Sequence, residues 1–438
     1  MNNHTVNEHI QCRLMVIGAG MAGMAATLFA ANRQIDTVQV GVTGEINFAS
    51  GLLDLLAVHP IPSGTLWDNP REAVRRLVRE APDHPYARLT MDRIESALEE
   101  FTSFLKKVGH PYYFHSGRNS QVLTAVGTAK TTYAVPLSMH NGSIAYKKRL
   151  PCLLVDFEGL KGFSGRQIAE TMKRQWPALR HVSLGFPDVS GEAYTEHMAR
   201  ALETESIRAQ LADAVRPYLK GVEMVGLPAI LGIYRTRDII AFLEDALGLP
   251  VFEIPGIPPS ITGLRLREVF EDQLPHRGVR TFYQKRVLSA HIQKNGSFLF
   301  AVGGGEPEVR ITADAVILAT GRFFGKGLTA DHREIREALF DLPVFQPDCR
   351  GQWHRRAFLN PGGHPINQCG LETDEQFRPL SLEKKPVHHH LYAAGSILAH
   401  QDWIRQKCGS GLAIATAHAA VAAFERATDN EIDASATG

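Results

Sequence analysis

The sequence predicts an α/β fold in which a Rossmann-type domain is split in the chain around an inserted α+β domain. Two observations carry this prediction. Near the N-terminus a glycine motif stands between an apolar run and a helical pattern, which is the order of a β-α-β unit. Far down the chain, short β-rich pieces lead into a second apolar strand pattern, "ADAVILATG", as expected where the same sheet is resumed.

The first part of the split domain is expected over residues 1–62. An apolar run over residues 13–17 predicts a strand, and after the glycine turn the pattern predicts a helix over 22–32 and a strand over 37–42. The stretch "NFASGLLDLL" and a proline-rich loop over 59–70 then mark the exit from this part.

The inserted domain is expected over residues 63–220. Apolar residues at helical spacing predict one helix that ends before Gly109 and Pro111, and a second helix over residues 192–219. The spaced residues are Ile94, Leu98, Phe101, Leu105 and Val108 in the first helix, and Met198, Leu202, Leu211 and Val215 in the second.

The split domain is expected to resume over residues 221–430. Two apolar stretches, "GVEMVGLPAILGIY" and "LPVFEIPGIPPSITGLRL", read as buried strands that feed a helix. A β-meander follows over residues 279–320, with a hairpin turn at Asn295-Gly296, and the chain ends in a strand, a glycine-bearing loop and a long alanine-rich helix. Residues 431–438 are predicted to be a disordered tail.

Composition excludes several classes of function. The 47 basic and 46 acidic residues nearly cancel, so no overall field attracts nucleic acid or an anionic membrane. The five cysteines are scattered, which fits neither a disulfide framework nor an iron–sulfur or zinc site and indicates a reducing cytoplasm. No apolar run reaches the ~20 residues that span a bilayer. Residues 388–390 are three consecutive histidines, which alternate in direction on a strand and predict no metal site.

The glycine motif predicts a cofactor with a phosphate. Gly18, Gly20 and Gly23 satisfy GxGxxG between the strand and the helix, and Met21 and Ala22 open that helix. Glycines permit the tight turn and the close approach of backbone to a phosphate, while the helix N-terminus supplies N–H groups and positive dipole.

The predicted second strand lacks the carboxylate that usually binds the ribose of a dinucleotide about 20 residues after the motif. It ends at Val40-Gly41-Val42-Thr43, and Glu45 lies several residues too late. We therefore expect that the turn holds a single terminal phosphate, such as that of FMN. The alternative is FAD whose adenosine is held by backbone and hydroxyl groups alone.

Further small residues indicate flavin rather than nicotinamide, because glycines and hydroxyls let the chain pass close to an isoalloxazine ring. A helix N-terminus after the last glycines favours negative charge on reduced flavin. The expected flavin contacts are Ser50, Gly51, Leu52, Lys130, Thr320, Gly321, Gly395, Ser396, Gly409, Gly411 and Leu412.

Taken together, these segments resemble the B subunits of anaerobic glycerol-3-phosphate dehydrogenase, within the fumarate-reductase-like flavoproteins. The resemblance runs through most of the chain. The stretches that carry it are the glycine motif, "ASGLLDLL", "LPCLLVDFEGLKGF", "IPPSITGLRL", "ATGRFFGKGL", "GLETDEQFRP" and "AAGSIL...CGSG".

The resemblance implies a flavin subunit, usually with FMN, that pairs with a second flavoprotein subunit and an iron–sulfur, membrane-anchoring subunit. It implies oxidation of glycerol 3-phosphate to dihydroxyacetone phosphate, with electrons passed to a quinone through the partners. The chain would then be cytoplasmic and peripheral on the inner face of the membrane. Two alternatives stay open: an electron-transfer subunit without its own substrate site, and an independent FAD-dependent oxidoreductase.

Oxidation of a secondary alcohol needs a base near neutrality and cations for the phosphate. In the loop between Ser396 and Gly409, His400 is our candidate base and Arg405 our candidate phosphate contact. Arg322 follows the Thr320-Gly321 turn and is a third catalytic candidate, while Arg265 is a further cation that could bind phosphate.

Overall fold

The computed structural model describes residues 8–42, 45–187 and 191–436, without the side chains of 45 and 430–436. The chain forms two compact units. The first is assembled from Met1–Glu45, Leu55–Phe101 and Phe270–Gly438, and the second from Ile46–Asp54 and Thr102–Val269. The predicted α/β class, with one domain split around another, is confirmed.

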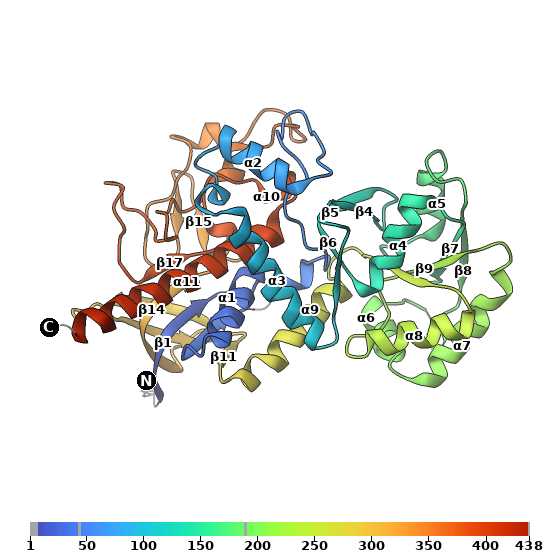
Figure 1. The fold of residues 1–438 in the computed structure, drawn as a ribbon, viewed down its shortest axis with the longest axis horizontal. Coiled ribbons are helices and arrows are strands. Elements are labelled where there is room, and N and C mark those ends of the chain that lie inside the picture. Colours follow the sequence, from blue (N-terminus) through green and yellow to red (C-terminus); the bar gives the residue numbers. More distant parts are fainter. Residues whose placement is uncertain (1–7, 43–44, 188–190, 437–438) are drawn as a thin grey trace. The chain divides into compact units, whose positions relative to one another are not determined.

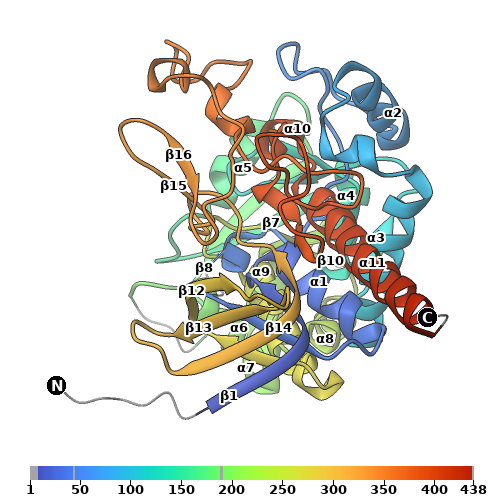
Figure 2. The same ribbon diagram turned by 90° about the vertical axis from the view of Figure 1, so that its left-hand side faces the viewer.

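The first unit is built on a seven-stranded sheet in the order β11-β2-β1-β14-β13-β12, with β17 paired to β14. β1 lies between β2 and β14 and is parallel to both, so the two ends of the chain share one sheet. Figure 2 shows β12, β13 and β14 side by side. The strands are β1 (Glu8–Ile17), β2 (Thr37–Gly41), β11 (Arg280–Tyr283), β12 (Arg286–Ile292), β13 (Phe298–Gly303), β14 (Val309–Leu318) and β17 (Leu391–Ala393).

Two helices from opposite ends of the chain pack together on this sheet. Helix α1 (Met21–Asn32) is buried over nearly its whole length, and the long α11 (Gly409–Ala436) lies beside it (Figure 1). Small residues on both helices allow this close packing. The unit also contains α2 (Pro70–Glu80), most of α3 (Met91–Lys107), α10 (Trp403–Gln406) and the pair β15 (Leu328–Ala330) and β16 (Ile335–Glu337).

The second unit has its own four-stranded parallel sheet in the order β10-β9-β7-β8. Its central strands are fully buried, which explains their continuous apolar sequences. The strands are β7 (Cys152–Phe157), β8 (Leu179–Leu184), β9 (Met224–Pro228) and β10 (Val251–Ile254), with the antiparallel pairs β3 (Tyr112–Phe114) with β6 (Ala134–Pro136) and β4 (Ser120–Leu123) with β5 (Ala129–Thr132).

The boundaries of the units differ from those expected at residues 62 and 220. The stretch expected to resume the split domain supplies β9 and β10, which extend the sheet of the second unit. That unit therefore continues to Val269, within α9 (Ile261–Gln273), and it also takes the segment Ile46–Asp54. Its other helices are α4 (Leu137–Lys148), α5 (Gly165–Met172), α6 (Thr195–Ala201), α7 (Glu205–Val215) and α8 (Thr236–Leu247).

The single helix expected over residues 192–219 is two helices, α6 and α7. The chain turns between them, where the Glu203 carboxylate accepts hydrogen bonds from the backbone N–H groups of Ile233 (2.7 Å) and Tyr234 (2.9 Å) just before α8. The apolar period continues across the break, so the sequence pattern does not reveal it.

Two further expectations concern the C-terminal half. The hairpin at Asn295-Gly296 is confirmed, because β12 and β13 pair across it. Helix α11 extends to Ala436, so most of the expected tail is helical; residues 437 and 438 lie outside the described residues. No helix in the described ranges is long and apolar enough to cross a membrane.

Glu100 joins three helices of the first unit and should make its stability depend on pH. Its carboxylate accepts from Asn32 (2.7 Å) and Arg33 (3.2 Å), and His418 lies 3.3 Å away. Partial burial raises the pKa of Glu100, but hydrogen bonds from His418, Asn32 and Arg33 outweigh it and lower the pKa to about 2.

Because this folded-state pKa is depressed, the stabilisation is complete above about pH 4.5 and is lost as the pH falls toward about 2. We expect the free energy of unfolding in urea to decline over that window, and Glu100→Gln to remove much of the decline. The exposed Glu375→Gln is the matched control and should leave the decline intact. Equal pH profiles for Glu100→Gln and wild type would contradict the assignment.

Candidate functional site

The glycine turn between β1 and α1 forms a closely packed backbone cradle. Gly18 has φ +134°, and a Cβ placed on it would lie 2.1 Å from the carbonyl oxygen of Ala319. A Cβ on Gly23 would lie 2.0 Å from the oxygen of Gly18. Gly20 is the N-cap of α1 and provides no side-chain cap, and Met21 and Ala22 follow without an acidic residue in the first turn. The helix N-terminus is thus suited to an anion.

The end of β14 lies directly beside this turn. Ala319 N–H donates to the oxygen of Ile17 at 2.9 Å. This hydrogen bond places Ala319 next to Gly18. The next residue, Thr320, has a buried Oγ1 without a hydrogen-bond partner among the described residues, and Gly321 turns away with φ +68°. A hydroxyl left unpaired beside a phosphate cradle is a natural contact for a bound polar group.

The C-terminal glycine loop packs against the N-terminal glycine turn. Gly395 has φ +80°, and a Cβ on it would lie 2.5 Å from the Cβ of Ala22. Its N–H donates to Thr416 Oγ1 of α11 at 2.9 Å. The structure thus brings the two glycine segments together on α1. Half-buried Ser396 follows Gly395, and Gly409, Gly411 and Leu412 form the first turn of α11, which has no acidic residue.

The end of β2 carries no carboxylate in its described residues. Gly41 lies against the turn, since a Cβ on it would lie 2.6 Å from the backbone N of Ala19. Gln39 is buried and donates through Nε2 to the oxygen of Gly18 at 3.0 Å. Thr43 and the side chain of Glu45 lie outside the described residues. The residues of β2 therefore support the glycine turn through Gln39 and Gly41, and none of them offers a carboxylate for a ribose.

The expected contacts Ser50, Gly51, Leu52 and Lys130 belong to the second unit. Lys130 Nζ lies 2.9 Å from Asp54 Oδ2 and donates to Ser50 Oγ at 3.3 Å. The oxygen of Gly51 accepts from Tyr112 at 2.7 Å. These contacts join the segment 50–54 to β5 and β3, and the charge of Lys130 is balanced by Asp54.

Two predicted cations have structural tasks. Arg322 donates through Nη2 to the oxygens of Leu398 (3.1 Å) and Gln401 (2.9 Å) and through Nη1 to that of Asn367. Burial lowers the pKa of Arg322 to about 10, so it stays protonated at neutral pH. The two Nη groups of Arg322 thus hold the loops around His400, and its catalytic role stays a prediction. Arg265 likewise pairs with buried Glu253 rather than a phosphate.

His400 lies in a left-handed turn, with φ +62°, at the edge of the first unit's glycine loop. Its Nε2 is 3.1 Å from Glu372 Oε1, and its ring centroid is 4.1 Å from that of Phe345. A backbone hydrogen bond of 2.9 Å to the oxygen of Gln368 fixes the turn. The imidazole is therefore held on one side by a carboxylate and on another by an aromatic ring.

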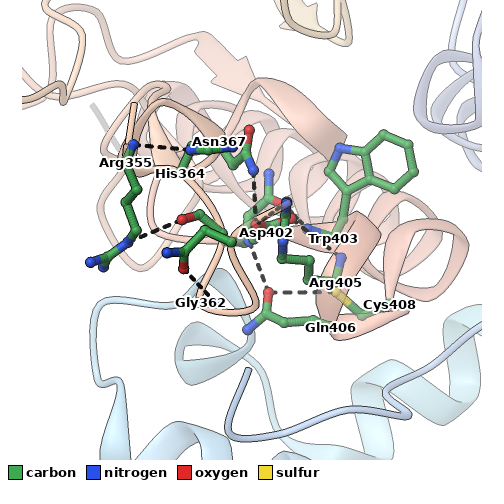
Figure 3. A network of polar contacts seen from close by, with 12 residues as sticks. Arg355, Gly362, His364, Asn367, Asp402, Trp403, Arg405, Gln406 and Cys408 are labelled. Carbon is green, nitrogen blue, oxygen red and sulfur yellow. Dashed lines mark hydrogen bonds and ion pairs between the residues drawn. The ribbon is translucent and has the colours of Figure 1, made fainter. Parts of the chain in front are cut away.

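Arg405 on α10 is held by Asp402, which is buried. Its Nη1 lies 3.2 Å from Asp402 Oδ2, and the same oxygen accepts from Asn367 Nδ2 at 3.1 Å. Figure 3 shows Asp402 at the centre of this network, with Arg355 on its far side. The Nε and Nη2 groups of Arg405 have no partner among the described residues, and its partly exposed fork can bind an oxyanion.

Sequence reasoning missed Glu372 and Asp402, which hold the two candidate residues. Glu372 lies in the stretch "GLETDEQFRP", which carries the resemblance, but no sequence pattern around either residue indicates the side chain that it contacts. Among the residues the structure describes, no group of three histidine, cysteine or acidic side chains could hold a metal ion, the three consecutive histidines included.

Comparison with known proteins gives relatives along the whole chain. A probable B subunit of anaerobic glycerol-3-phosphate dehydrogenase from Halobacterium salinarum is 32% identical over 96% of this chain and 100% of its own. A B subunit of anaerobic glycerol-3-phosphate dehydrogenase from Vibrio vulnificus is 28% identical over 93% and 95%. A solved 3-ketosteroid Δ1-dehydrogenase from Sterolibacterium denitrificans is similar with a TM-score of 0.44 and 12% identity, over 95% of this chain and 100% of that chain.

The family model described as the FAD binding domain matches residues 13–412, which contain both glycine segments. This match corrects the expectation of FMN. The missing carboxylate on β2 removes one ribose contact, but the phosphate contacts of FAD can still form at the backbone cradle at Gly18 and the uncapped start of α1, and the unpaired Thr320 Oγ1 offers a further polar contact. The chain belongs to the FAD-binding domain family of oxidoreductases.

Proposed function

We propose that this chain is the FAD-binding B subunit of an anaerobic glycerol-3-phosphate dehydrogenase and oxidises sn-glycerol 3-phosphate to dihydroxyacetone phosphate. The observation that carries the proposal is the 32% identity to a probable B subunit over the full length of that relative. Because these relatives are named as B subunits, we further propose that this chain works in a complex with other subunits. Its other members would be a second flavoprotein subunit and an iron–sulfur subunit that anchors the complex to the inner face of the cell membrane and delivers electrons to quinone.

In this proposal the cofactor is held by the two glycine segments of the first unit. The start of α1 at Gly20 to Gly23 would face the pyrophosphate, and Thr320, Gly395 and the first turn of α11 would border the flavin. The segment 50–52 and Lys130 stay predicted flavin contacts. FAD, when bound, supplies the acceptor for the two electrons of the substrate.

The chain's own residues supply the acid–base and binding chemistry. His400 would accept the proton of the substrate's secondary hydroxyl, because its imidazole is oriented by the Glu372 carboxylate. Arg405 would bind the phosphate through its open Nε and Nη2 groups, while Asp402 keeps the guanidinium in place.

The test is anaerobic bleaching of the flavin in the full-length chain loaded with FAD. We expect sn-glycerol 3-phosphate to bleach it and glycerol to do so only weakly, since glycerol lacks the phosphate. His400→Asn should slow bleaching ~10²–10⁴-fold, and Arg405→Met should raise the substrate concentration needed for half-maximal rate ~10-fold or more. Arg356→Met, an exposed cation of the same unit, is the control for Arg405.

Two results would overturn the proposal in different ways. If dithionite bleaches the flavin but sn-glycerol 3-phosphate does not, the chain is a relay subunit without its own substrate site. If glycerol bleaches the wild-type flavin as fast as sn-glycerol 3-phosphate does, and if the Arg405→Met variant is bleached by sn-glycerol 3-phosphate as fast as wild type, the assignment of Arg405 to phosphate binding is wrong.

A further inference from the structure

Glu372 is placed beside His400 by the backbone. Leu371 forms a parallel bridge with Leu398. Leu371 N–H donates to the oxygen of Ile397 at 2.8 Å, and Ala399 N–H donates back to the oxygen of Leu371 at 2.9 Å. These two bonds fix the relative position of the segments that carry the two side chains, although they are far apart in the sequence.

His400, Glu372 and Lys384 form a row of three contacting side chains whose exposure to solvent increases along it. His400 is 16% exposed, Glu372 is 28% exposed and Lys384 is 64% exposed. Glu372 Oε1 contacts His400 Nε2 at 3.1 Å, and Glu372 Oε2 forms an ion pair with Lys384 Nζ. One carboxylate thus has its two oxygens occupied by different partners, and it cannot turn away from the imidazole without losing Lys384.

The charges around this row determine which nitrogen of His400 carries the proton. Partial burial raises the pKa of Glu372, but hydrogen bonds from Lys384 and His400 outweigh it and lower the pKa, so the carboxyl is ionised at neutral pH. An ionised carboxylate only accepts hydrogen bonds. His84 is close enough to interact electrostatically with His400, and burial lowers the pKa of His84 to about 3, which keeps it neutral.

We propose that Glu372 is a positioning residue that holds the Nε2–H of His400 and leaves Nδ1 as the atom that accepts the substrate proton. This inference rests on the proposed function. The hydroxyl O–H bond would break with its proton going to Nδ1, and the carbon–oxygen bond would become a carbonyl. FAD, when bound, would supply the acceptor for the hydride of the carbinol C–H bond, so that atoms and electrons balance. Nδ1 has no hydrogen-bond partner among the described residues, and the imidazolium that forms lies against the Glu372 carboxylate.

Three variants test the role in the full-length chain loaded with FAD. Glu372→Gln keeps the shape but offers an amide that can donate or accept, so Nε2–H is no longer fixed. We expect it to slow bleaching by sn-glycerol 3-phosphate ~10²-fold or more, with KM within about twofold of wild type. The midpoint of the rate–pH profile should move to lower pH, because the negative charge that favours the imidazolium is gone. Glu372→Asp should restore part of the rate.

Glu383→Gln removes the same charge from an exposed position close by and should change neither rate nor pH midpoint. A wild-type rate and midpoint for Glu372→Gln would overturn the inference. If His400→Asn itself bleaches at the wild-type rate, the proposed base is wrong instead, so the two failures are distinguishable.

A second readout does not depend on activity. In ¹H–¹⁵N spectra of the chain labelled in histidine, the signals that vanish in His400→Asn identify His400. We expect these signals to report a protonated Nε2 in wild type and a mixture of the two neutral forms in Glu372→Gln. A protonated Nδ1 in wild type would overturn the inference whatever the rates are.

Discussion

Gly18→Ala is expected to abolish FAD binding and to destabilise the first unit by at least ~2 kcal/mol. Two costs add at this position. A φ of +134° is strained for any residue with a Cβ. In addition, the new Cβ would lie 2.1 Å from the oxygen of Ala319, a backbone atom of the paired strand that has no freedom to move aside.

The substitution is expected to weaken FAD binding because the ends of β1 and β14 would have to separate at the position where the phosphate cradle forms. The measurement is the amount of FAD released by denaturing the purified variant, together with its melting temperature. Gly278→Ala is the matched control in the same unit: its φ is +81°, but nothing lies within 4 Å of the added Cβ. It should lose only ~1 kcal/mol and keep its FAD. A Gly18→Ala chain that retains stoichiometric FAD would refute the cradle.

The sequence predicted the parts of the site that depend on local backbone geometry. Gly18 and Gly395 are in conformations that favour glycine, and the patterns on either side of Gly18 predicted α1 and the end of β1, although β1 begins earlier than expected, at Glu8. The sequence also predicted that the strand pattern of "ADAVILATG" resumes this sheet, but not that β14 pairs directly with β1.

The cofactor was predicted wrongly because one contact was given too much weight. The absence of a carboxylate at the end of β2 is real, and Gly41 lies against the turn. A ribose hydroxyl can be bound by other groups, however, so the absence does not remove the adenosine. The contacts of a dinucleotide are spread over many residues, and no single position decides its identity.

The partners of the candidate residues were not predictable for a different reason. Glu372 reaches His400 through a bridge between two irregular segments, and Arg322 reaches three backbone carbonyls from distant loops. Such contacts have no sequence period. The boundary between the units was misplaced for a similar reason. A buried strand such as β9 has the same apolar sequence pattern whichever of the two sheets it joins.

Arg265→Met is expected to destabilise the second unit by roughly 3–5 kcal/mol. Arg265 and Glu253 form a two-pronged pair, with Nη1–Oε2 at 2.6 Å and Nη2–Oε1 at 2.7 Å, and their side chains are 6% and 0% exposed. Arg265 also donates to the oxygen of Gly232, and Glu253 accepts from the N–H of Leu231. Loss of the arginine would leave a carboxylate buried without its counter-charge.

The direction in which the stability of Arg265→Met changes with pH provides a sharper test than the loss of stability at one pH. In wild type, burial raises the pKa of Glu253, but Arg265 outweighs it and lowers the pKa, so stability declines as the pH falls through that value. Without Arg265 the hydrogen bonds from Ser138 and Leu231 would still lower the pKa of Glu253, but burial is the largest effect and would outweigh them, so the folded-state pKa would lie above the unfolded one. The urea midpoint of Arg265→Met should therefore rise on going from neutral pH to about pH 4.5, a range in which Glu253 gives wild type no such rise because its lowered pKa acts only below about pH 4.5.

A second substitution separates loss of the pair from loss of packing. Glu253→Leu in the Arg265→Met background removes the buried charge, so the double variant should be more stable than Arg265→Met at neutral pH and should lose the inverted pH dependence. Arg235→Met breaks an exposed pair with Asp238 in the same unit and should cost under ~1 kcal/mol. If Arg265→Met and Arg235→Met are equally stable, the buried pair does not hold the second unit together.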